Sequence, residues 1–484
     1  MFIVKELRNG CAHTQSYNHI IFSSFNLFIY HPTMKNNEGG FTSNFGAIAA
    51  AAGSAIGLGN IWRFPYTAGV NGGGAFLLLY IFFVFLIGVP IMMSELAMGR
   101  RTGQNAVGAF RTMSPRGKGW MFVGFWGILT TFFIYSFYSV ITGWTLDYVV
   151  LSCSGGLSGK TPKEVSTVFK EFASGSFWPI FYQIIFMLLT ILVILMGVQK
   201  GIEKSSKILM PVLLVLMVVL CVRSVTLEGA GEGLSFLFHP DFSKITGACV
   251  LDALGQAMFS LSIGLGVLIT YGSYVRKQDN LFKSSLIIAS ADTMIAVMAG
   301  VAIFPAVFAF GQNPASGPSL VYETLPNVFN SMPGGVVFAV AFFVLLSIAA
   351  LTSTVSLLET IVHFVMQEFK LKRWSAALLC TGAKLVIGIL CTLSFGPLSD
   401  VTLFGKTIFD ILDTLTATYM LPLGALATVI FLGWFCHKSD VKAEVTNEGT
   451  LKAGFFKVYY FIVRYLAPIA LLCVLVAGIV ASFR

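Results

Sequence analysis

The sequence predicts an all-α integral membrane protein with two inverted five-helix repeats (spans 1–5 and 6–10) and an eleventh helix, in which helices 1 and 6 are discontinuous. Hydrophobic residues make up 56% of the 484 residues and charged residues only 11%, whereas about a quarter of the residues in soluble domains are charged. Apolar runs of about 18 residues or more recur along the chain, each long enough to cross ~30 Å of hydrocarbon. One glycine-rich tetrapeptide occurs in two of these runs.

The apolar runs define eleven predicted membrane spans joined by short loops. They cover residues 45–70, 76–98, 120–151, 178–199, 206–222, 247–275, 282–310, 334–369, 375–396, 405–436 and 455–481. Lys and Arg gather in the loops after spans 2, 4, 6 and 8, whereas the opposite loops carry acids such as Glu228, Asp241 and Glu323. Because short cationic loops stay in the cytoplasm, we expect a multi-pass protein of the cell (inner) membrane with a cytoplasmic N-terminus and an external C-terminus.

The composition also argues against several function classes. The net charge of +9 comes mostly from these loops, so nucleic acid is not an expected partner, whereas the lipid bilayer is. The eight cysteines are scattered and show no CxxC or metal spacing, so we expect no disulfide framework, zinc site or other cofactor. The chain has no HExxH or GxSxG motif and its six histidines are scattered, so an enzyme is not expected.

The span pattern divides the chain into four expected segments. These are an N-terminal leader and cytoplasmic tail (1–40), a first five-helix repeat (41–236), a second, inverted repeat (237–437), and a cytoplasmic loop with the eleventh helix (438–484). The apolar stretch at 18–30 is too short to span a membrane and lacks a cleavage site. We therefore expect Met34 to be the true start of translation and residues 1–33 to be absent from the native protein.

Spans 1 and 6 share an unusual centre. The tetrapeptide Ile-Gly-Leu-Gly appears at 56–59 and again at 263–266, near the middle of each span. Each glycine costs a helix roughly 1 kcal/mol relative to alanine, and unwound backbone at this depth is tolerated only where protein buries it or it lines a cavity. Close helix packing would explain either site alone. Because the two sites open two five-span units, they predict paired broken helices around a transporter's central site.

Several longer strings carry a specific resemblance. They are AGSAIGLGNIWRFP at 52–65, NGGGAF at 71–76, QAMFSLS at 256–262 and YGSY at 271–274. With them, residues 41 to about 436 resemble the neurotransmitter:sodium symporter family, in its bacterial amino-acid branch. The resemblance implies a sodium-coupled secondary active symporter that imports an amino acid by alternating access.

The expected substrate site lies at the two breaks. Unpaired N–H groups of the half-helix that begins near Gly59 suit a carboxylate, and the resemblance implies that Tyr138 donates a hydrogen bond to it. The expected substrate-binding residues are Ala55, Gly57, Gly59, Ile134, Tyr138, Phe259, Ser260, Ser262, Leu265, Ser353 and Leu357. Monoamine members carry Asp where this chain has Gly57, and the lining is apolar, so we expect a neutral, hydrophobic or aromatic L-amino acid.

The resemblance also implies two sodium ions as coupling ions. The first site would use the carbonyls of Ala55 and Ser260, the side chains of Asn60, Ser260 and Asp292, and the substrate carboxylate. That shared ligand would couple the two affinities reciprocally. The second site would use the carbonyls of Gly53, Ile56 and Ala349 with the hydroxyls of Thr352 and Ser353, although such hydroxyls more often bond their own helix.

Asp292 departs from the Asn more common in the family. Members with Asn balance the charge with chloride or with a Glu four residues further on, which is Ala296 here. We therefore expect Asp292 to supply the negative charge and transport to be independent of chloride.

The expected gates follow from the same resemblance. Arg63 and Asp413 match the family's extracellular ion pair, Phe259 its aromatic lid, and Tyr274 part of its inner gate. Three other inner-gate positions differ, with Glu38, Phe41 and Gln367 in place of Arg, Trp and Asp, so the inner gate must use other contacts.

Three alternatives to this function remain. A proton-coupled amino-acid permease of the same broken-helix architecture would use Asp292 as its proton carrier. A membrane-embedded enzyme and a regulatory sensor are less well supported, because motifs and an extra soluble domain are missing from the sequence. The oligomeric state is expected to be a monomer or a homodimer.

Overall fold

The structure is a computed structural model that describes residues 40–115, 117–314, 320–451 and 453–482. The proposed leader at 1–33 lies outside the described residues. Within them the chain is helical, apart from its loops and one isolated bridge between Leu403 and Lys406.

The first half of the chain contains five membrane-crossing segments and three short connecting helices. In order, the elements are α2 (Asn44–Ala55), η1 (Gly59–Arg63), α3 (Phe64–Val70), α4 (Gly74–Phe83), η2 (Val84–Gly88), α5 (Val89–Thr102), α6 (Ala106–Met113), α7 (Met121–Cys153), α8 (Pro162–Ser174), α9 (Phe177–Leu195), η3 (Val198–Glu203), α10 (Lys204–Val225) and α11 (Ala230–Phe238).

The second half repeats the pattern and adds a final helix. Its elements are η4 (Phe242–Lys244), α12 (Gly247–Ser260), α13 (Val267–Gly272), α14 (Leu281–Ala309), η5 (Leu320–Thr324), α15 (Leu325–Ser331), α16 (Gly335–Phe369), α17 (Arg373–Leu393), α18 (Ile408–Thr414), η6 (Leu415–Met420), α19 (Leu421–Ile430), η7 (Phe431–Phe435), α20 (Lys438–Val445), η8 (Ala453–Phe455), α21 (Phe456–Phe461), η9 (Ile462–Leu466) and α22 (Ala467–Ser482).

The observed helices agree with the predicted spans. Among the described residues, nine helices are long and apolar enough to cross a membrane, and the bent pair 44–55 and 59–70 makes a tenth. The predicted sixth span, 247–275, appears as α12 and α13 with a break between them. The fifth span is longer than the predicted 206–222, because the polar segment before it is also helical and the whole runs from Val198 to Val225.

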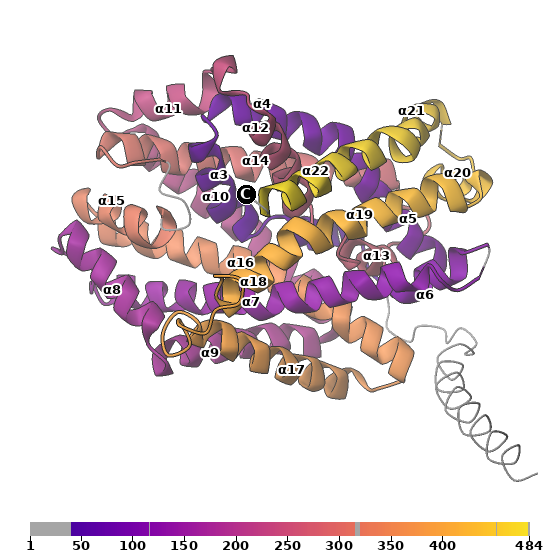
Figure 1. Cartoon of the computed structure of the whole chain (residues 1–484), viewed down its shortest axis with the longest axis horizontal. Coiled ribbons are helices and arrows are strands. Elements are labelled where there is room, and N and C mark those ends of the chain that lie inside the picture. Colours follow the sequence, from indigo (N-terminus) through magenta and orange to yellow (C-terminus); the bar gives the residue numbers. More distant parts are fainter. Residues whose placement is uncertain (1–39, 116, 315–319, 452, 483–484) are drawn as a thin grey trace, which may run out of the picture.

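Short connecting helices lie at the two ends of the molecule. Figure 1 shows α8, α11 and α15 at one end, and α6 and α20 at the other. They are too short for a span analysis to detect. Side-chain caps begin two of them, with Asn105 at the start of α6 and Thr161 at the start of α8. Thr161 and Glu164 form a capping box at the start of α8, and hydrogen bonds from Thr161 hold the pKa of the exposed Glu164 carboxyl below its usual value.

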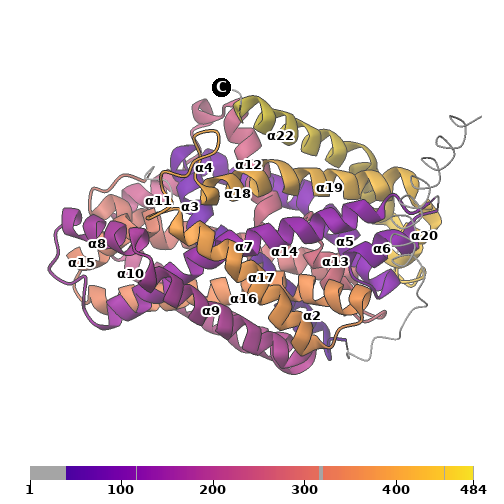
Figure 2. The ribbon, with the colours of Figure 1, turned by 60° about the horizontal axis from the view of Figure 1, so that its bottom comes forward.

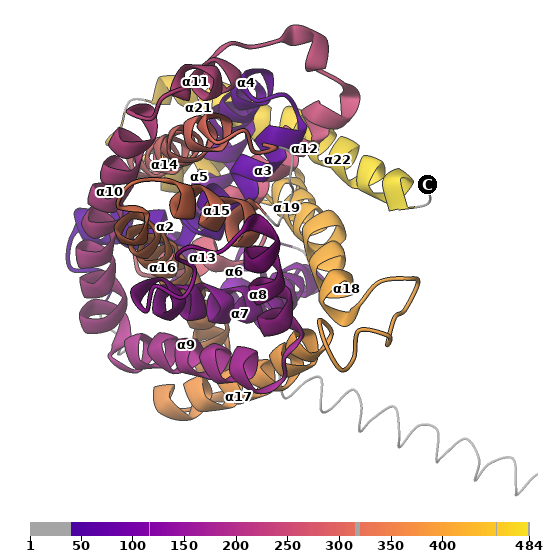
Figure 3. The ribbon, with the colours of Figure 1, turned by 90° about the vertical axis from the view of Figure 1, so that its left-hand side faces the viewer.

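The centre of the bundle consists of helices from both halves. Helix α7 packs along α16, α9 and α17, while α2 packs against α16, α14 and α10. Viewed from one end (Figure 3), α2, α13 and α16 lie in the interior of the bundle, and α9, α10 and α17 are among the helices around them. The last helix, α22, lies beside α19 at the edge of the molecule (Figure 2). The breaks in spans 1 and 6 therefore lie in the interior of the protein.

Candidate functional site

The first span is broken where the sequence places its glycines. Helix α2 ends at Ala55, the chain resumes a helical path at Gly59, and the two pieces are bent by 47°. Residues 56–58 are buried and leave backbone groups outside the helical ladder. Backbone polar groups that are buried need partners, and here other spans supply some of them.

The sixth span is interrupted over residues 261–266. Gly264 and Gly266 have φ of 84° and 75°, and Ser262, a residue with a side chain, has φ of 55°. A Cβ added at Gly264 would lie 2.7 Å from the carbonyl oxygen of Leu421. Glycine is therefore required at Gly264 both by the left-handed backbone and by the close approach of α19.

Side chains bind the unwound backbone, some of them from other spans. In the first break, the Leu58 N–H donates to the Tyr138 hydroxyl of α7 (3.2 Å), and the Gly57 N–H donates to Oδ1 of Asn60 in the same span (3.1 Å). In the second break, the Gly264 N–H donates to Oε1 of Glu95 (2.8 Å). The Thr131 hydroxyl donates to the Leu265 carbonyl (2.7 Å). These contacts hold both breaks open at the same place in the bundle.

A cavity lies between the two breaks. The cavity is nearly closed in this structure, with about 40 Å³ of open space. Its lining comprises all eleven residues predicted for substrate binding, together with Ser54: Ser54, Ala55, Gly57, Gly59, Ile134, Tyr138, Phe259, Ser260, Ser262, Leu265, Ser353 and Leu357. The structure thus brings the predicted set together, although it does not test the role of each residue.

The cavity has a polar and an apolar part. Tyr138 accepts one hydrogen bond from Leu58 and, as a phenol, still has an O–H to donate. A Cβ added at Gly57 would lie 2.2 Å from the Ser353 Oγ and 3.4 Å from the Tyr138 hydroxyl. Ile134, Leu265 and Leu357 supply aliphatic surface. This arrangement suits a ligand with one polar end and an apolar side chain.

Asp292 lies fully buried beside the cavity and is surrounded by donors. Its carboxylate accepts from Asn60 Nδ2 (2.8 Å), the Tyr80 hydroxyl (2.8 Å) and the Ser260 hydroxyl (2.8 and 3.0 Å). The described residues place no Lys or Arg in an ion pair with it. The cluster is therefore a set of hard oxygens with a net negative charge when Asp292 is ionised, which suits a small cation.

Two helices that carry residues predicted to bind a second sodium ion pack against each other. The Cβ position of Gly53 is 3.3 Å from Cβ of Thr352, because α2 packs on α16. The Thr352 hydroxyl donates to the carbonyl of Ala349 (3.0 Å) on its own helix, so the ordinary back-bonding is present. A hydroxyl that donates in this way keeps lone pairs for a cation.

At one side of the cavity, two predicted gate residues, Arg63 and Phe259, lie against each other. The guanidinium carbon of Arg63 lies 4.3 Å from the centre of the Phe259 ring, which is a cation–π contact. Asp413 lies near enough to Arg63 for an electrostatic interaction between the two side chains. The described residues contain no direct Arg63–Asp413 ion pair, so the ring contact is the closer interaction of Arg63 here.

On the other side of the cavity, Tyr274 contacts several residues from different segments. Its hydroxyl donates to Glu359 (2.7 Å), its ring stacks on His363, and its carbonyl accepts from the N–H of Phe41. Glu359 in turn pairs with Arg373. Gln367, in the position of the family's Asp, instead accepts from the backbone (2.7 Å) and the side chain (2.8 Å) of Asn105.

Glu203 holds the segment that precedes α2. Its carboxylate accepts from the Thr42 N–H (2.8 Å), the Thr42 hydroxyl (2.6 Å) and the Ser43 hydroxyl (3.1 Å). Lys207 also pairs with it at 2.6 Å, and the Glu203 side chain is only 2% exposed. The sequence did not identify this contact between η3 and the segment before α2.

Five residues that contribute to the site were missed from sequence: Ser54, Tyr80, Glu95, Glu203 and Gln256. Gln256 donates to the Gly59 carbonyl (2.9 Å), and Tyr80 and Glu95 bind as described above. Of these five residues, only Glu95 could have been identified from the sequence. It lies within a predicted span, and an ionisable residue inside a membrane is a functional candidate by default.

Comparison with known proteins gives a consistent picture. A model of the sodium:neurotransmitter symporter family matches residues 39–169 and 173–483. An uncharacterized sodium-dependent transporter of Bacillus subtilis, YhdH, is 42% identical over 438 residues, which cover 90% of this chain and 96% of that protein. Another, from Haemophilus influenzae, is 36% identical over 91% of this chain and 98% of its own length. The crystal structure of MhsT in complex with L-phenylalanine is similar with a TM-score of 0.85 and 44% identity, covering 91% of this chain and 100% of that one.

Proposed function

The chain belongs to the sodium:neurotransmitter symporter family, and on that premise we propose that it imports a neutral, hydrophobic or aromatic L-amino acid together with sodium ions. The family makes it a sodium-dependent membrane transporter and not an enzyme. The amino acid is the finer part of the proposal. Its main support is the cavity between the two broken helices, which has polar groups at one end and aliphatic surface at the other.

The carboxylate of the amino acid is assigned to Tyr138 and to the backbone N–H groups near Gly59. The ammonium is assigned to backbone carbonyls at the breaks and to the hydroxyls of Ser260 and Ser262. The side chain then lies against Ile134, Leu265 and Leu357. The relative MhsT binds L-phenylalanine, which supports an aromatic or large aliphatic side chain.

Two sodium ions are proposed as coupling ions. The first would bind the side chains of Asn60, Ser260 and Asp292. The carbonyls of Ala55 and Ser260 and the substrate carboxylate would complete its ligands. The second would bind between Gly53 and Ile56 of the first break and Ala349, Thr352 and Ser353 of α16. Because one ion shares a ligand with the substrate, each raises the affinity of the other.

Chloride independence is proposed from the Asp292 cluster. The hydroxyls of Tyr80 and Ser260 already donate to a carboxylate that belongs to the protein. The negative charge that balances sodium is therefore built into the chain. We also propose a cytoplasmic N-terminus, from the positive-inside pattern, with import by alternating access. Whether the protein is a monomer or a homodimer stays a prediction.

The energy available to such a symporter is adequate. Two sodium ions that cross about 100 mV inward gain about 4.6 kcal/mol. That corresponds to roughly 10³-fold accumulation of a neutral substrate before any sodium gradient is added.

Uptake into proteoliposomes tests the proposal. Radiolabelled L-phenylalanine should accumulate when an inward sodium gradient is imposed, equally in chloride and in gluconate, with Tyr138→Phe reducing uptake. Uptake that persists without sodium and follows a pH gradient would instead support a proton-coupled permease. Uptake that is lost in gluconate would refute chloride independence alone.

A further inference from the structure

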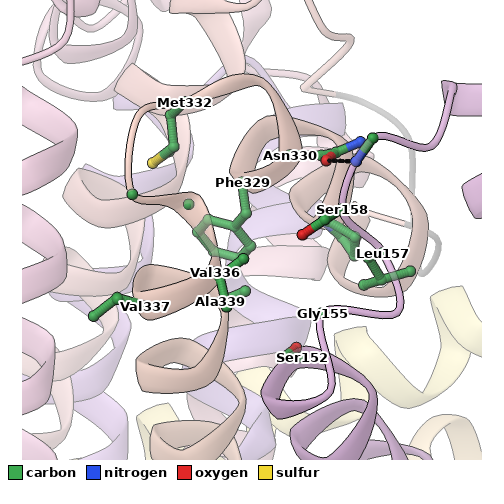
Figure 4. Close-up of a pocket in the computed structure, with 14 residues that line it drawn as sticks. Ser152, Gly155, Leu157, Ser158, Phe329, Asn330, Met332, Val336, Val337 and Ala339 are labelled. Carbon is green, nitrogen blue, oxygen red and sulfur yellow. Dashed lines mark hydrogen bonds between the residues drawn. The ribbon is translucent and has the colours of Figure 1, made fainter.

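A second, larger hollow lies away from the central cavity, at the end of the molecule that carries α8 and α15. Its open space is about 320 Å³. Figure 4 shows it between the loop after α7, helix α15 and the start of α16. We call it the outer pocket. None of its lining residues belongs to the substrate, sodium or gate residues proposed above.

Most of the wall of the outer pocket is apolar. Leu157, Phe329, Met332 and Ala339 line it, and Phe329 and Met332 are nearly buried, at 7% exposure each. No Lys, Arg, Asp or Glu lies among the lining residues. The pocket therefore favours an apolar group. It has no charged side chain that could pair with a highly charged ligand.

Two polar features border this apolar wall. Ser152, at the end of α7, is 3% exposed, and its hydroxyl has no hydrogen-bond partner among the described residues. A buried hydroxyl without a partner is unfavourable, so a ligand that bonds it gains affinity. The second feature is the start of α16, a helix of 35 residues that no side chain caps, since its cap residue is Gly334. The Gly335 N–H already donates to the Met332 carbonyl (3.1 Å) and the Val337 N–H to the Gly334 carbonyl (3.0 Å). The remaining N–H groups of the first turn attract negative charge.

The loop that forms one side of the outer pocket is fixed by Asn330. Its Oδ1 accepts from the Gly159 N–H (2.9 Å), and its Nδ2 donates to the Lys160 carbonyl. Figure 4 shows the Asn330 contact at the rim. Both polar groups of Asn330 are thus used in holding the wall, so the pocket is a preformed part of the fold.

We propose that the outer pocket binds a carboxylate carried on an apolar group. The carboxylate lies between the Ser152 hydroxyl and the start of α16, and the apolar group packs against Phe329 and Met332. A phosphate dianion is a poorer match, because Lys and Arg are missing from the lining. Two sources share the proposed chemistry: a fatty acid that enters from the bilayer, and a free hydrophobic amino acid from solution.

Calorimetric titration of the detergent-solubilised protein in sodium-free buffer tests this proposal. The central site proposed above requires sodium, so binding seen without sodium reports on the outer pocket, and its failure leaves the symport proposal untouched. Decanoate serves as the fatty-acid probe and L-phenylalanine as the amino-acid probe. We expect saturable one-to-one binding of at least one probe, and the probe that binds identifies the source.

Two variants and a control locate that binding. Ser152→Ala removes the hydroxyl and should weaken binding at least about tenfold, since hydrogen bonds to charged groups contribute about 1.5–3 kcal/mol. Ala339→Phe fills the pocket and should abolish binding. Ser154→Ala, which removes a hydroxyl already bonded to the Leu151 carbonyl outside the pocket, should have no effect. Absence of saturable binding for both probes, or binding unchanged in Ser152→Ala, overturns the proposal.

Discussion

Replacing Asp292 by asparagine should weaken sodium binding strongly while leaving the shape of the site unchanged. The two side chains have the same size, but the amide lacks the charge. In the structure the Asp292 carboxylate accepts from Asn60, Tyr80 and Ser260 at 2.8 Å each and is fully buried. The described residues provide no second acid in this cluster, so Asp292 alone supplies its negative charge.

The size of the effect follows from Coulomb's law. Two unit charges about 4 Å apart attract by roughly 4 kcal/mol at an effective dielectric constant of 20. That energy corresponds to about 10³ in affinity. The amide oxygen introduced by Asp292→Asn still coordinates a cation through its dipole, so we expect the half-saturating sodium concentration to rise by about 10²- to 10³-fold.

The assay is sodium-dependent binding of radiolabelled L-phenylalanine to purified protein in chloride-free buffer. Tyr80→Phe is the matched control, because it removes one donor to Asp292 and keeps the charge. It should shift the sodium requirement by no more than about tenfold, the value of one hydrogen bond. A half-saturating sodium concentration in Asp292→Asn within about threefold of that of the unmodified protein would refute the reasoning.

Three further substitutions probe the breaks and the contact made by Glu203. Gly57→Ala places a Cβ 2.2 Å from the Ser353 Oγ, so equilibrium binding of L-phenylalanine should be lost while thermal unfolding in detergent still shows a folded protein; retained binding would contradict the proposed pocket. Glu95→Leu removes the acceptor of the Gly264 N–H and should destabilise the protein by about 1–3 kcal/mol in thermal unfolding, whereas Glu95→Gln, which keeps an acceptor, should lie near the unmodified protein. Glu203→Gln weakens three hydrogen bonds to Thr42 and Ser43 and should raise several-fold the labelling rate of a cysteine introduced at the buried Ala47, in the first turn of α2. Lys207→Met is the control, and equal labelling rates in the unmodified protein and both variants would show that Glu203 does not hold this segment.

The fold was largely predictable because its causes lie in local sequence. Apolar runs determine the spans, and the repeated Ile-Gly-Leu-Gly weakens two helices at matching positions. The helices α6, α8, α11, α15 and α20 were not predicted, because each is shorter than a span. The extension of the fifth span back to Val198 was also missed, since Lys200 and Lys204 gave that segment the composition of a loop.

The site was predictable where a motif identified it and unpredictable where a lone polar residue completes it. The eleven predicted substrate residues line one cavity, although their roles stay predictions. Tyr80 and Gln256 each occupy a span in which nothing nearby shows their partners, which are the distant Asp292 and the Gly59 carbonyl. In the sequence, Glu203 looks like one more charged residue in a cationic loop. Only the folded structure places Thr42 and Ser43 next to it. Such partners depend on tertiary packing and leave no local trace.

Everything proposed for transport depends on the breaks after α2 and α12 binding amino acid and sodium together. The most direct measurement is the affinity of the purified protein for L-phenylalanine across a sodium titration in chloride-free buffer, paired with its affinity for sodium across a titration of the amino acid. We predict that each ligand raises the affinity for the other by the same factor. Tight amino-acid binding that is unchanged from zero to saturating sodium would contradict the account.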